Sequence, residues 1–230
     1  MGGQTQDTLK NAAPNQEKMN ISKSKMEFVH PFFTHMGMPD PVGQYSLRSS
    51  GVAARTEGRT QGDFGFHLET GLMKRVGLHI RNDRVLNNAH TEIAIQYAAI
   101  HSEDGMKGIS PFVEVEIPTH KNEHNTFVLV GLSTMWSAQR FEINQSIEYS
   151  PKEDAIEGSI AVVGKTDQRF FPVVEFVLAT AKDIEAENSM IVGLKYQINK
   201  PIALGLGYQF PVTETKEFTQ QVMLQTDLEW

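Results

Sequence analysis

The 230-residue chain contains no cysteine, which removes disulfides, Cys-ligated zinc and thiol catalysis together. It has no run of the roughly 20 consecutive apolar residues that a membrane helix needs, so a helical membrane protein is excluded. The net charge of −7, without a basic stripe, argues against nucleic acid as a partner. The first thirty residues show no cationic start followed by an apolar stretch. We therefore expect no signal peptide and interpret the chain as the mature form of an exported protein.

Two short segments precede the patterned part of the chain. Residues 1–28 are polar and rich in Gln, Asn, Lys and Ser, which predicts a flexible tail. Residues 29–43 (VHPFFTHMGMPDPVG) combine aromatic residues with three prolines, two histidines and two methionines. We interpret them as an irregular lead-in segment, with a plug as one of its possible roles. Residues 44–230 are interpreted as a single β-barrel.

From residue 44 onward, apolar and polar residues alternate with a period of two, which is typical of β-strands. The last strand is the clearest, with Val222, Leu224, Leu228 and Trp230 on one face and Gln221, Gln225, Asp227 and Glu229 on the other. Similar segments recur along the chain and predict about twelve antiparallel strands.

The links between the expected strands alternate broadly in length, although residues 101–108 form a longer link than the pattern predicts. Short links are expected near Met73–Arg75, Ser137–Arg140 and Asn199–Pro201, and longer, charged links near residues 56–62, 82–90, 118–126, 150–158 and 180–189. Outer-membrane barrels have short periplasmic turns and longer external loops. The pattern predicts such a barrel, with both chain ends on the periplasmic side.

A soluble sandwich or lipocalin-like barrel is the alternative, and it would turn the apolar face inward. Three features favour the membrane. The polar face carries Gly, Ala and Ser among isolated charges, and the chain stops at an aromatic residue on the apolar face. Aromatic residues also lie near strand ends on that face, as in interfacial girdles: Tyr97, Trp136, Phe141, Tyr149, Tyr196, Tyr208, Phe210, Phe218 and Trp230.

The terminal stretch FTQQVMLQTDLEW resembles the C-terminal signal that the bacterial barrel-assembly machinery recognises, with Phe218, Leu228 and Trp230 as its signal residues. The stretches HPFFTHMGMPDPVGQYSLR, GDFGFHLETGL and VGLHIRNDRVLNN resemble a family of bacterial outer-membrane proteins labelled as transporters and similar to barrels associated with phenol degradation. This resemblance covers most of residues 29–230. It implies a barrel in the bacterial outer membrane, with membrane lipids and the assembly machinery as partners, and it supplies no catalytic residues.

Strand parity identifies the side chains that would face the lumen. The candidate pore-lining residues are Arg48, His67, Glu69, His79, Arg81, Glu92, Glu114, Glu116, Glu142, Glu148, Glu175, Lys195, Asp227 and Glu229. Acids outnumber bases in this set, so a water-filled lumen would favour cations. A plugged interior, in which these groups pair with one another, is the alternative.

The segment HPFFTHMGM offers His30, His35, Met36 and Met38 as candidate metal ligands. Imidazole and thioether ligands suit copper, especially Cu(I). The same segment also fits a hydrophobic anchor packed under the barrel. We expect no other cofactor.

A barrel hydrolase would need a Ser/His pair on the membrane-facing wall. His67 and His79 fall on the polar face, and no serine nucleophile motif adjoins them, so we expect no enzyme. The leading hypothesis is an outer-membrane transport barrel, a narrow pore or uptake channel for small cationic or aromatic solutes. The alternative is a closed structural barrel with a copper-like site in its N-terminal segment.

Overall fold

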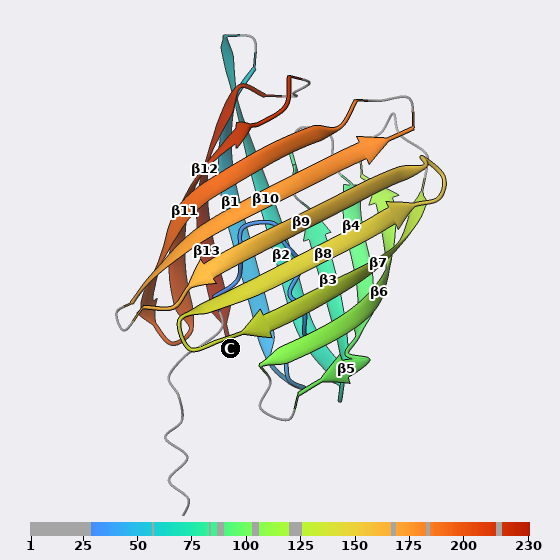
Figure 1. Ribbon diagram of the computed structural model, residues 1–230, viewed down its shortest axis with the longest axis vertical. Coiled ribbons are helices and arrows are strands. Elements are labelled where there is room, and N and C mark those ends of the chain that lie inside the picture. The colour runs from blue at the N-terminus through green and yellow to red at the C-terminus, as the bar shows by residue number, and fades with distance from the viewer. Residues whose placement is uncertain are drawn as a thin grey trace, which may run out of the picture.

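The computed structural model describes residues 29–56, 58–82, 84–86, 90–102, 106–119, 126–166, 169–182, 185–214 and 218–230. The expected tail, residues 1–28, lies outside this part of the chain. Within the described ranges, no helix has the length and apolar character needed to cross a membrane. The described residues instead form one sheet of antiparallel strands wrapped into a barrel (Figure 1).

Twelve strands close the barrel, and a two-residue strand, β5, adds to the edge of β6. The predicted all-β barrel of about twelve strands is therefore confirmed. The strands are β1 (Tyr45–Thr56), β2 (Arg59–Met73), β3 (Val76–Asn82), β4 (His90–Tyr97), β5 (Ile100–His101), β6 (Lys107–Pro118), β7 (Phe127–Ser137), β8 (Phe141–Ser150), β9 (Ala155–Gly164), β10 (Phe170–Ala181), β11 (Glu187–Asn199), β12 (Ile202–Pro211) and β13 (Gln220–Glu229).

The first and last strands close the ring. β1 pairs with β13 in a register that runs from Ser46 opposite Glu229 to Arg55 opposite Gln220. Just beyond this ladder, Tyr45 and Trp230 exchange two backbone hydrogen bonds of 3.0 Å, and their rings stack with centroids 6.0 Å apart. Trp230 thus extends the pairing at the seam between the first and last strands.

The two ends of the barrel differ in their connections. The end that carries Trp230, called the Trp230 end below, has tight turns at residues 74–75, 138–140 and 200–201. The opposite end, called the loop end, carries the longer connections from β3 to β4, from β6 to β7 and from β12 to β13. These turns and long links lie where the link lengths predict them. The predicted long links at residues 56–62 and 150–158 are short, since only residues 151–154 join β8 to β9.

The largest difference is at the link predicted at residues 56–62. β1 and β2 stay paired to Thr56 and Arg59, and Gly58 takes a φ of 80° that suits a tight turn. The hairpin projects at the loop end (Figure 1). The prediction of a long loop there was wrong because the tip of this hairpin is polar on both faces, so the alternation of apolar residues stops before the strands do.

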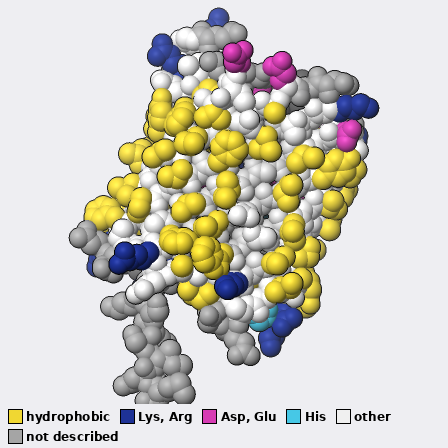
Figure 2. All heavy atoms as spheres, in the orientation of Figure 1, with side chains coloured by type: hydrophobic (Ala, Val, Ile, Leu, Met, Phe, Trp, Pro, Cys, Tyr) yellow, Lys and Arg dark blue, Asp and Glu magenta, His cyan; other side chains and the backbone are white. Residues whose placement is uncertain are grey.

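The outward face of the barrel is apolar. Ile147, Leu206 and Leu224 expose 53%, 55% and 63% of their surface at the middle of their strands. Figure 2 shows apolar side chains spread over the height of the barrel, with charged side chains gathered near its two ends. Most strands have 10 to 15 residues, enough to cross a bilayer at a tilt. A barrel that turns leucine outward and glutamate inward fits lipid rather than water.

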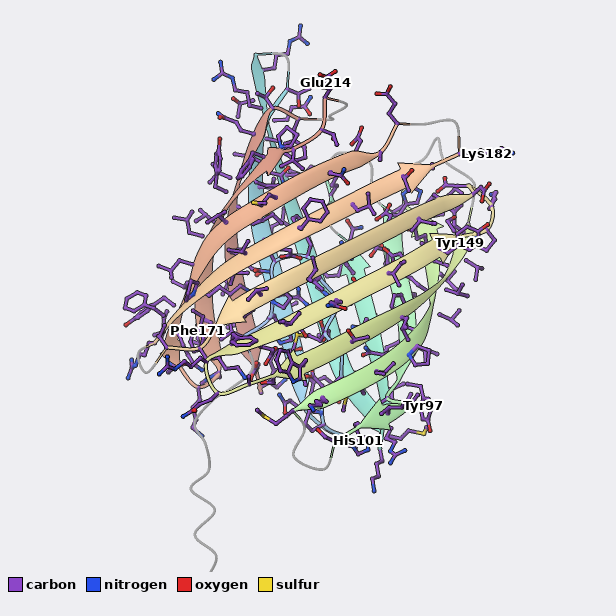
Figure 3. The ribbon with its side chains drawn as sticks, in the orientation of Figure 1. Tyr97, His101, Tyr149, Phe171, Lys182 and Glu214 are labelled. Carbon is purple, nitrogen blue, oxygen red and sulfur yellow. The ribbon has the colours of Figure 1, made fainter. Side chains whose placement is uncertain are left out.

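Aromatic side chains mark both edges of this apolar belt. At the Trp230 end, Trp136 packs against Phe141, and Phe170 packs against Tyr196. Figure 3 shows Tyr97 near this end and Tyr149 near the loop end. These positions match the interfacial girdles of membrane barrels.

Phe218 does not belong to these girdles. It precedes β13, which begins at Gln220, and it lines an interior cavity together with Val52 and Gln221. Its expected place on the outward face was wrong because strand parity does not extend into the loop before Gln220.

Candidate functional site: the occluded lumen

Residues 29–43, called the lumenal segment below, lie inside the barrel. They rise from the Trp230 end and return to the start of β1 (Figure 1). Val29, Phe32 and Met36 expose 6% of their surface or less, so the barrel wall covers them. The segment therefore fills space that would otherwise be open lumen.

Glu175 of β10 binds the top of the lumenal segment. Its carboxylate accepts backbone hydrogen bonds from Phe32 at 2.9 Å, from Phe33 at 3.1 Å and from Thr34. The Thr34 hydroxyl donates to the same carboxylate. An acidic side chain directed into an apolar cluster is costly unless its oxygens are satisfied. Here the backbone of the lumenal segment supplies the donors. Glu175 therefore needs the segment to satisfy its oxygens, and the segment is held to the wall by Glu175.

Two cations of the wall bind the adjacent carbonyl. Arg48 and Lys195 each donate to the Pro31 oxygen at 3.3 Å. Lys195 is fully buried and forms an ion pair of 2.8 Å with Asp227, while Arg48 forms one of 2.6 Å with Glu69. The same charges thus pair across the wall and hold the segment by its backbone.

The ring of Phe32 lies against a glycine surface. Gly193 of β11 faces Gly207 of β12 in the sheet register, and Gly205 is the next inward position on β12. A Cβ atom at Gly193 would come within 2.4 Å of the ring, and one at Gly205 within 3.2 Å. Inward glycine at these positions is therefore what allows an aromatic side chain to approach the wall.

The returning arm of the segment is held by amide and hydroxyl groups. Gln96 of β4 donates to the Met36 carbonyl at 2.7 Å, and Ser110 of β6 donates to the Gly37 carbonyl at 2.7 Å. Gln96 also donates to the Ser133 hydroxyl of β7 at 2.7 Å. Since these contacts come from strands across the barrel from Glu175, the segment spans the lumen.

A chain of imidazoles lies beneath the segment. Arg48 approaches His67 at 3.0 Å, His67 approaches His79 at 3.3 Å, and His79 approaches the Gln96 amide oxygen at 3.0 Å. Arginine can only donate, so His67 Nδ1 is the acceptor, and a proton on Nε2 of each histidine completes the chain. All four ring nitrogens of this pair are then engaged.

Titratable groups of the lumenal segment have shifted pKa values of opposite kinds. Burial lowers the pKa of His30 from 6.5 to about 4, against the attraction of Glu69, which raises it. Burial also lowers the pKa of His35 well below its usual range, helped by the charge of Arg81. Burial raises the pKa of Asp40 to about 6, and the negative charge of Glu69 adds to the effect. Burial therefore favours the neutral forms of these three groups.

Cavities lie on both sides of the segment. One of about 760 Å³ opens at the Trp230 end between the segment and the seam, and His30, Asp40 and Trp230 line it. One of about 300 Å³ lies toward the loop end, lined by Phe33 and Arg84 among others. These two cavities share no lining residue, and different residues of the lumenal segment line each of them.

A third cavity of about 200 Å³ adjoins the loop-end space and is acidic. It shares Arg81, Arg84 and Glu157 with its neighbour. Its remaining lining residues are His90, Glu92, Glu114, Glu116 and Glu148. With five glutamates against two arginines, the mouth of the lumen favours cations.

The structure directs all the candidate pore-lining side chains into the barrel. Nine are buried: Arg48, His67, Glu69, His79, Glu114, Glu142, Glu175, Lys195 and Asp227. The remaining five, Arg81, Glu92, Glu116, Glu148 and Glu229, are half-buried. Most of the buried members pair with one another or hold the lumenal segment, whereas Glu142 pairs with Lys165 at 3.3 Å. The acidic cavity gathers most of the half-buried ones.

The candidate copper ligands are not brought to a single point. His30, Met36 and Met38 line the cavity at the Trp230 end. His35 lies instead beside Phe112, His67 and His79, with ring centroids 5.1 to 6.1 Å away. A four-ligand site is therefore divided, because His35 faces the rings of the wall while the neighbouring Met36 faces the cavity.

Several residues that hold the segment were not predicted from the sequence. Gln96, Ser110 and Ser133 are uncharged, and nothing in their spacing marks them among the other polar inward residues. The glycines at 193, 205 and 207 did carry a signal. Successive inward glycines on neighbouring strands indicate that another group approaches the wall closely.

An apolar exterior, aromatic edges and a charged interior around an inserted segment define an integral membrane β-barrel. No protein-family model matches the chain. No curated protein matches it either. Its likenesses are to solved structures.

The chain is similar to the COG4313 outer membrane channel from Pseudomonas putida F1, with a TM-score of 0.61 and 10% identity over 88% of this chain and 100% of that one. It is similar to the KdgM porin, with a TM-score of 0.58 and 11% identity over 80% of this chain and 98% of that one. It is also similar to the NanC porin, with a TM-score of 0.57 and 9% identity over 81% and 98%. At these identities the likeness establishes the fold. The finer resemblance to barrels associated with phenol degradation stays a prediction.

Proposed function

We propose that this protein is a bacterial outer-membrane channel for small solutes whose lumen is closed by its own N-terminal segment. The observation that carries the proposal is the set of hydrogen bonds from Phe32, Phe33 and Thr34 to the Glu175 carboxylate. These bonds hold the lumenal segment between two cavities. A barrel that only needed stability could fill its interior from its own strands. Here a separate segment fills it through hydrogen bonds that can exchange with water.

The fold supports this proposal. The similar structures are described as an outer membrane channel and porins. In this reading the lipids of the outer membrane contact the apolar belt, the barrel-assembly machinery recognises the terminal strand through Leu228 and Trp230, and the protein carries out no catalysis. The acidic cavity at the loop end favours small cationic solutes.

Planar-bilayer recording of the refolded full chain tests the proposal. We expect wild-type protein to be closed most of the time, with brief openings that prefer cations in a salt gradient. Replacement of Glu175 by Gln weakens the hydrogen bonds to the lumenal segment, so we expect the Glu175→Gln channel to open far more often. Glu142 is the matched control, because it is an equally buried wall acid bonded to Ser137 and Asn144. Absence of current at every voltage from both wild type and Glu175→Gln would refute a channel.

A second function, a closed barrel that handles a soft metal, has one supporting observation. His30, Met36 and Met38 line the same 760 Å³ cavity, which opens at the Trp230 end. Imidazole and thioether groups there suit Cu(I). Competition with a chromophoric Cu(I) chelator would test it, with Met36→Leu/Met38→Leu as the variant. Strong Cu(I) binding that this variant abolishes, in a barrel that never conducts, would favour this function over transport.

A further inference from the structure

We propose that His35 of the lumenal segment, Glu114 of β6 and Glu148 of β8 form a binding site for a divalent first-row transition-metal ion such as Zn²⁺. One ligand atom from each side chain lies within 4.8 Å of the other two. A metal of this class binds such atoms at about 2.0–2.2 Å, so one ion at their centre can reach all three after small side-chain movements. The site would join the lumenal segment to two strands of the wall.

Glu148 provides a second, independent observation. Its Oε2 atom is buried and accepts no hydrogen bond from the residues that the structure describes, although Glu148 lines the acidic cavity. Glu114 and Glu157 lie close enough to act on it by charge. A buried carboxylate oxygen beside other carboxylates is unfavourable without a cation. A bound cation would satisfy this oxygen and offset the repulsion between Glu114 and Glu148.

Other groupings around His35 are weaker candidates. His67 and His79 also lie within reach of it, but their ring nitrogens are used in the chain from Arg48 to Gln96. The grouping of Glu92, Glu114 and Glu116 contains acids alone, and Glu92 already pairs with Arg81 at 3.4 Å.

The donor set indicates the class of metal. One imidazole nitrogen and two carboxylate oxygens suit a borderline ion such as Zn²⁺ or Co²⁺ better than Ca²⁺, which prefers oxygen alone. The adjoining 200 Å³ cavity leaves room for water as a further ligand and gives access from the loop end. Arg81 approaches His35 Nε2 at 3.4 Å, and its charge opposes the ion. Arg81→Gln should therefore raise the affinity.

Such an ion would act on the closed state. It binds only when the lumenal segment brings His35 to the wall, so by mass action it stabilises that arrangement. This closing effect rests on the proposed channel function, whereas binding itself can be measured without any current.

Cobalt titration of the refolded full chain in detergent tests the site, with the visible absorption of Co²⁺ as the readout and Zn²⁺ as competitor. We expect one Co²⁺ per chain, an imidazole nitrogen in its X-ray absorption spectrum, and displacement by Zn²⁺. His35→Gln and Glu148→Gln should each lower the affinity by at least about tenfold.

The matched controls are His90→Gln, which removes an imidazole from the lining of the same cavity, and Glu142→Gln, which removes a buried wall carboxylate outside that cavity. They should change the affinity far less. Heat-modifiable migration on a gel verifies that each variant folds. Wild-type affinity in both ligand variants, or a cobalt shell without imidazole nitrogen in wild-type protein, overturns the site. A barrel that conducts without binding Co²⁺ overturns the site and leaves the channel standing.

Discussion

Thr34 donates both its backbone amide and its hydroxyl group to the carboxylate of Glu175. The two residues are 141 positions apart in the chain: Glu175 lies in the β10–β11 ladder opposite Ile191, whereas Thr34 lies outside every described strand. A carboxylate that accepts several amide hydrogens binds a peptide segment tightly, yet it holds that segment by hydrogen bonds alone. We regard this contact as the attachment that keeps the lumenal segment in place.

Replacement of Glu175 by Gln should weaken this attachment of the lumenal segment. The amide keeps one acceptor oxygen but places its own N–H groups against the donors of Phe32 and Thr34. The loss of one charged hydrogen bond costs about 2 kcal/mol, roughly a 30-fold increase in opening. Hydrogen exchange of the amides at residues 32–34 should rise by that factor, while Glu142→Gln leaves it unchanged. Equal exchange in wild type and Glu175→Gln would show that the segment is held elsewhere.

The lumenal segment should respond to pH through two groups of opposite sign. An undocked His30 binds a proton below its ordinary pKa of 6.5, whereas the docked residue resists protonation until about 4, so docking weakens as the pH falls through this window. The pKa of Asp40 is about 6 when docked and 3.8 when undocked, so docking strengthens as the pH falls from 6 to 3.8.

These signs predict that two variants move the pH profile in opposite directions. His30→Gln should flatten the loss of docking between pH 6.5 and 4, and Asp40→Asn should make that loss steeper. Hydrogen exchange of the lumenal segment at a series of pH values measures both. A parallel shift of the two variants in one direction would contradict the assignment.

Much of this architecture is predictable from sequence because a membrane barrel repeats one physical rule on every strand. The alternation of apolar and polar residues predicts that Leu224 faces outward and Asp227 inward. The same alternation on the other strands predicts the pore-lining residues. The placement of residues 29–43 was beyond that rule. Whether His30 and His35 face the same cavity depends on how the segment turns, and its contacts with Glu175, Gln96 and Ser110 join residues that lie far apart in the chain.

The glycine surface under Phe32 gives a prediction that separates packing from hydrogen bonding. Gly205→Val would place a side chain where the Phe32 ring lies, and the nearest other atoms belong to the side chains of Lys195 and Gln225. Such overpacking costs about 1–3 kcal/mol. We expect the lumenal segment to exchange faster and the barrel to remain folded.

Removal of the ring should cancel this effect. In a Phe32→Ala background, Gly205→Val should cost much less, because only the side chains of Lys195 and Gln225 then remain close to the new side chain. Gly158→Val is the matched control, since a Cβ atom there meets only the Ser146 oxygen at 3.5 Å. Additive effects of Gly205→Val and Phe32→Ala would mean that the two positions do not interact.

The apolar belt predicts a dependence on depth that a soluble barrel would not show. Leu206 lies at the middle of β12, and Val212 lies just beyond its loop end on the same face, with 55% and 48% of their surfaces exposed. In a bilayer, lysine should cost about 2–4 kcal/mol at Leu206 and about 0–1 kcal/mol at Val212. Urea titration of folding into lipid vesicles measures both. Two exposed positions in water would tolerate lysine equally well, so equal stabilities for Leu206→Lys and Val212→Lys would refute a lipid-facing belt.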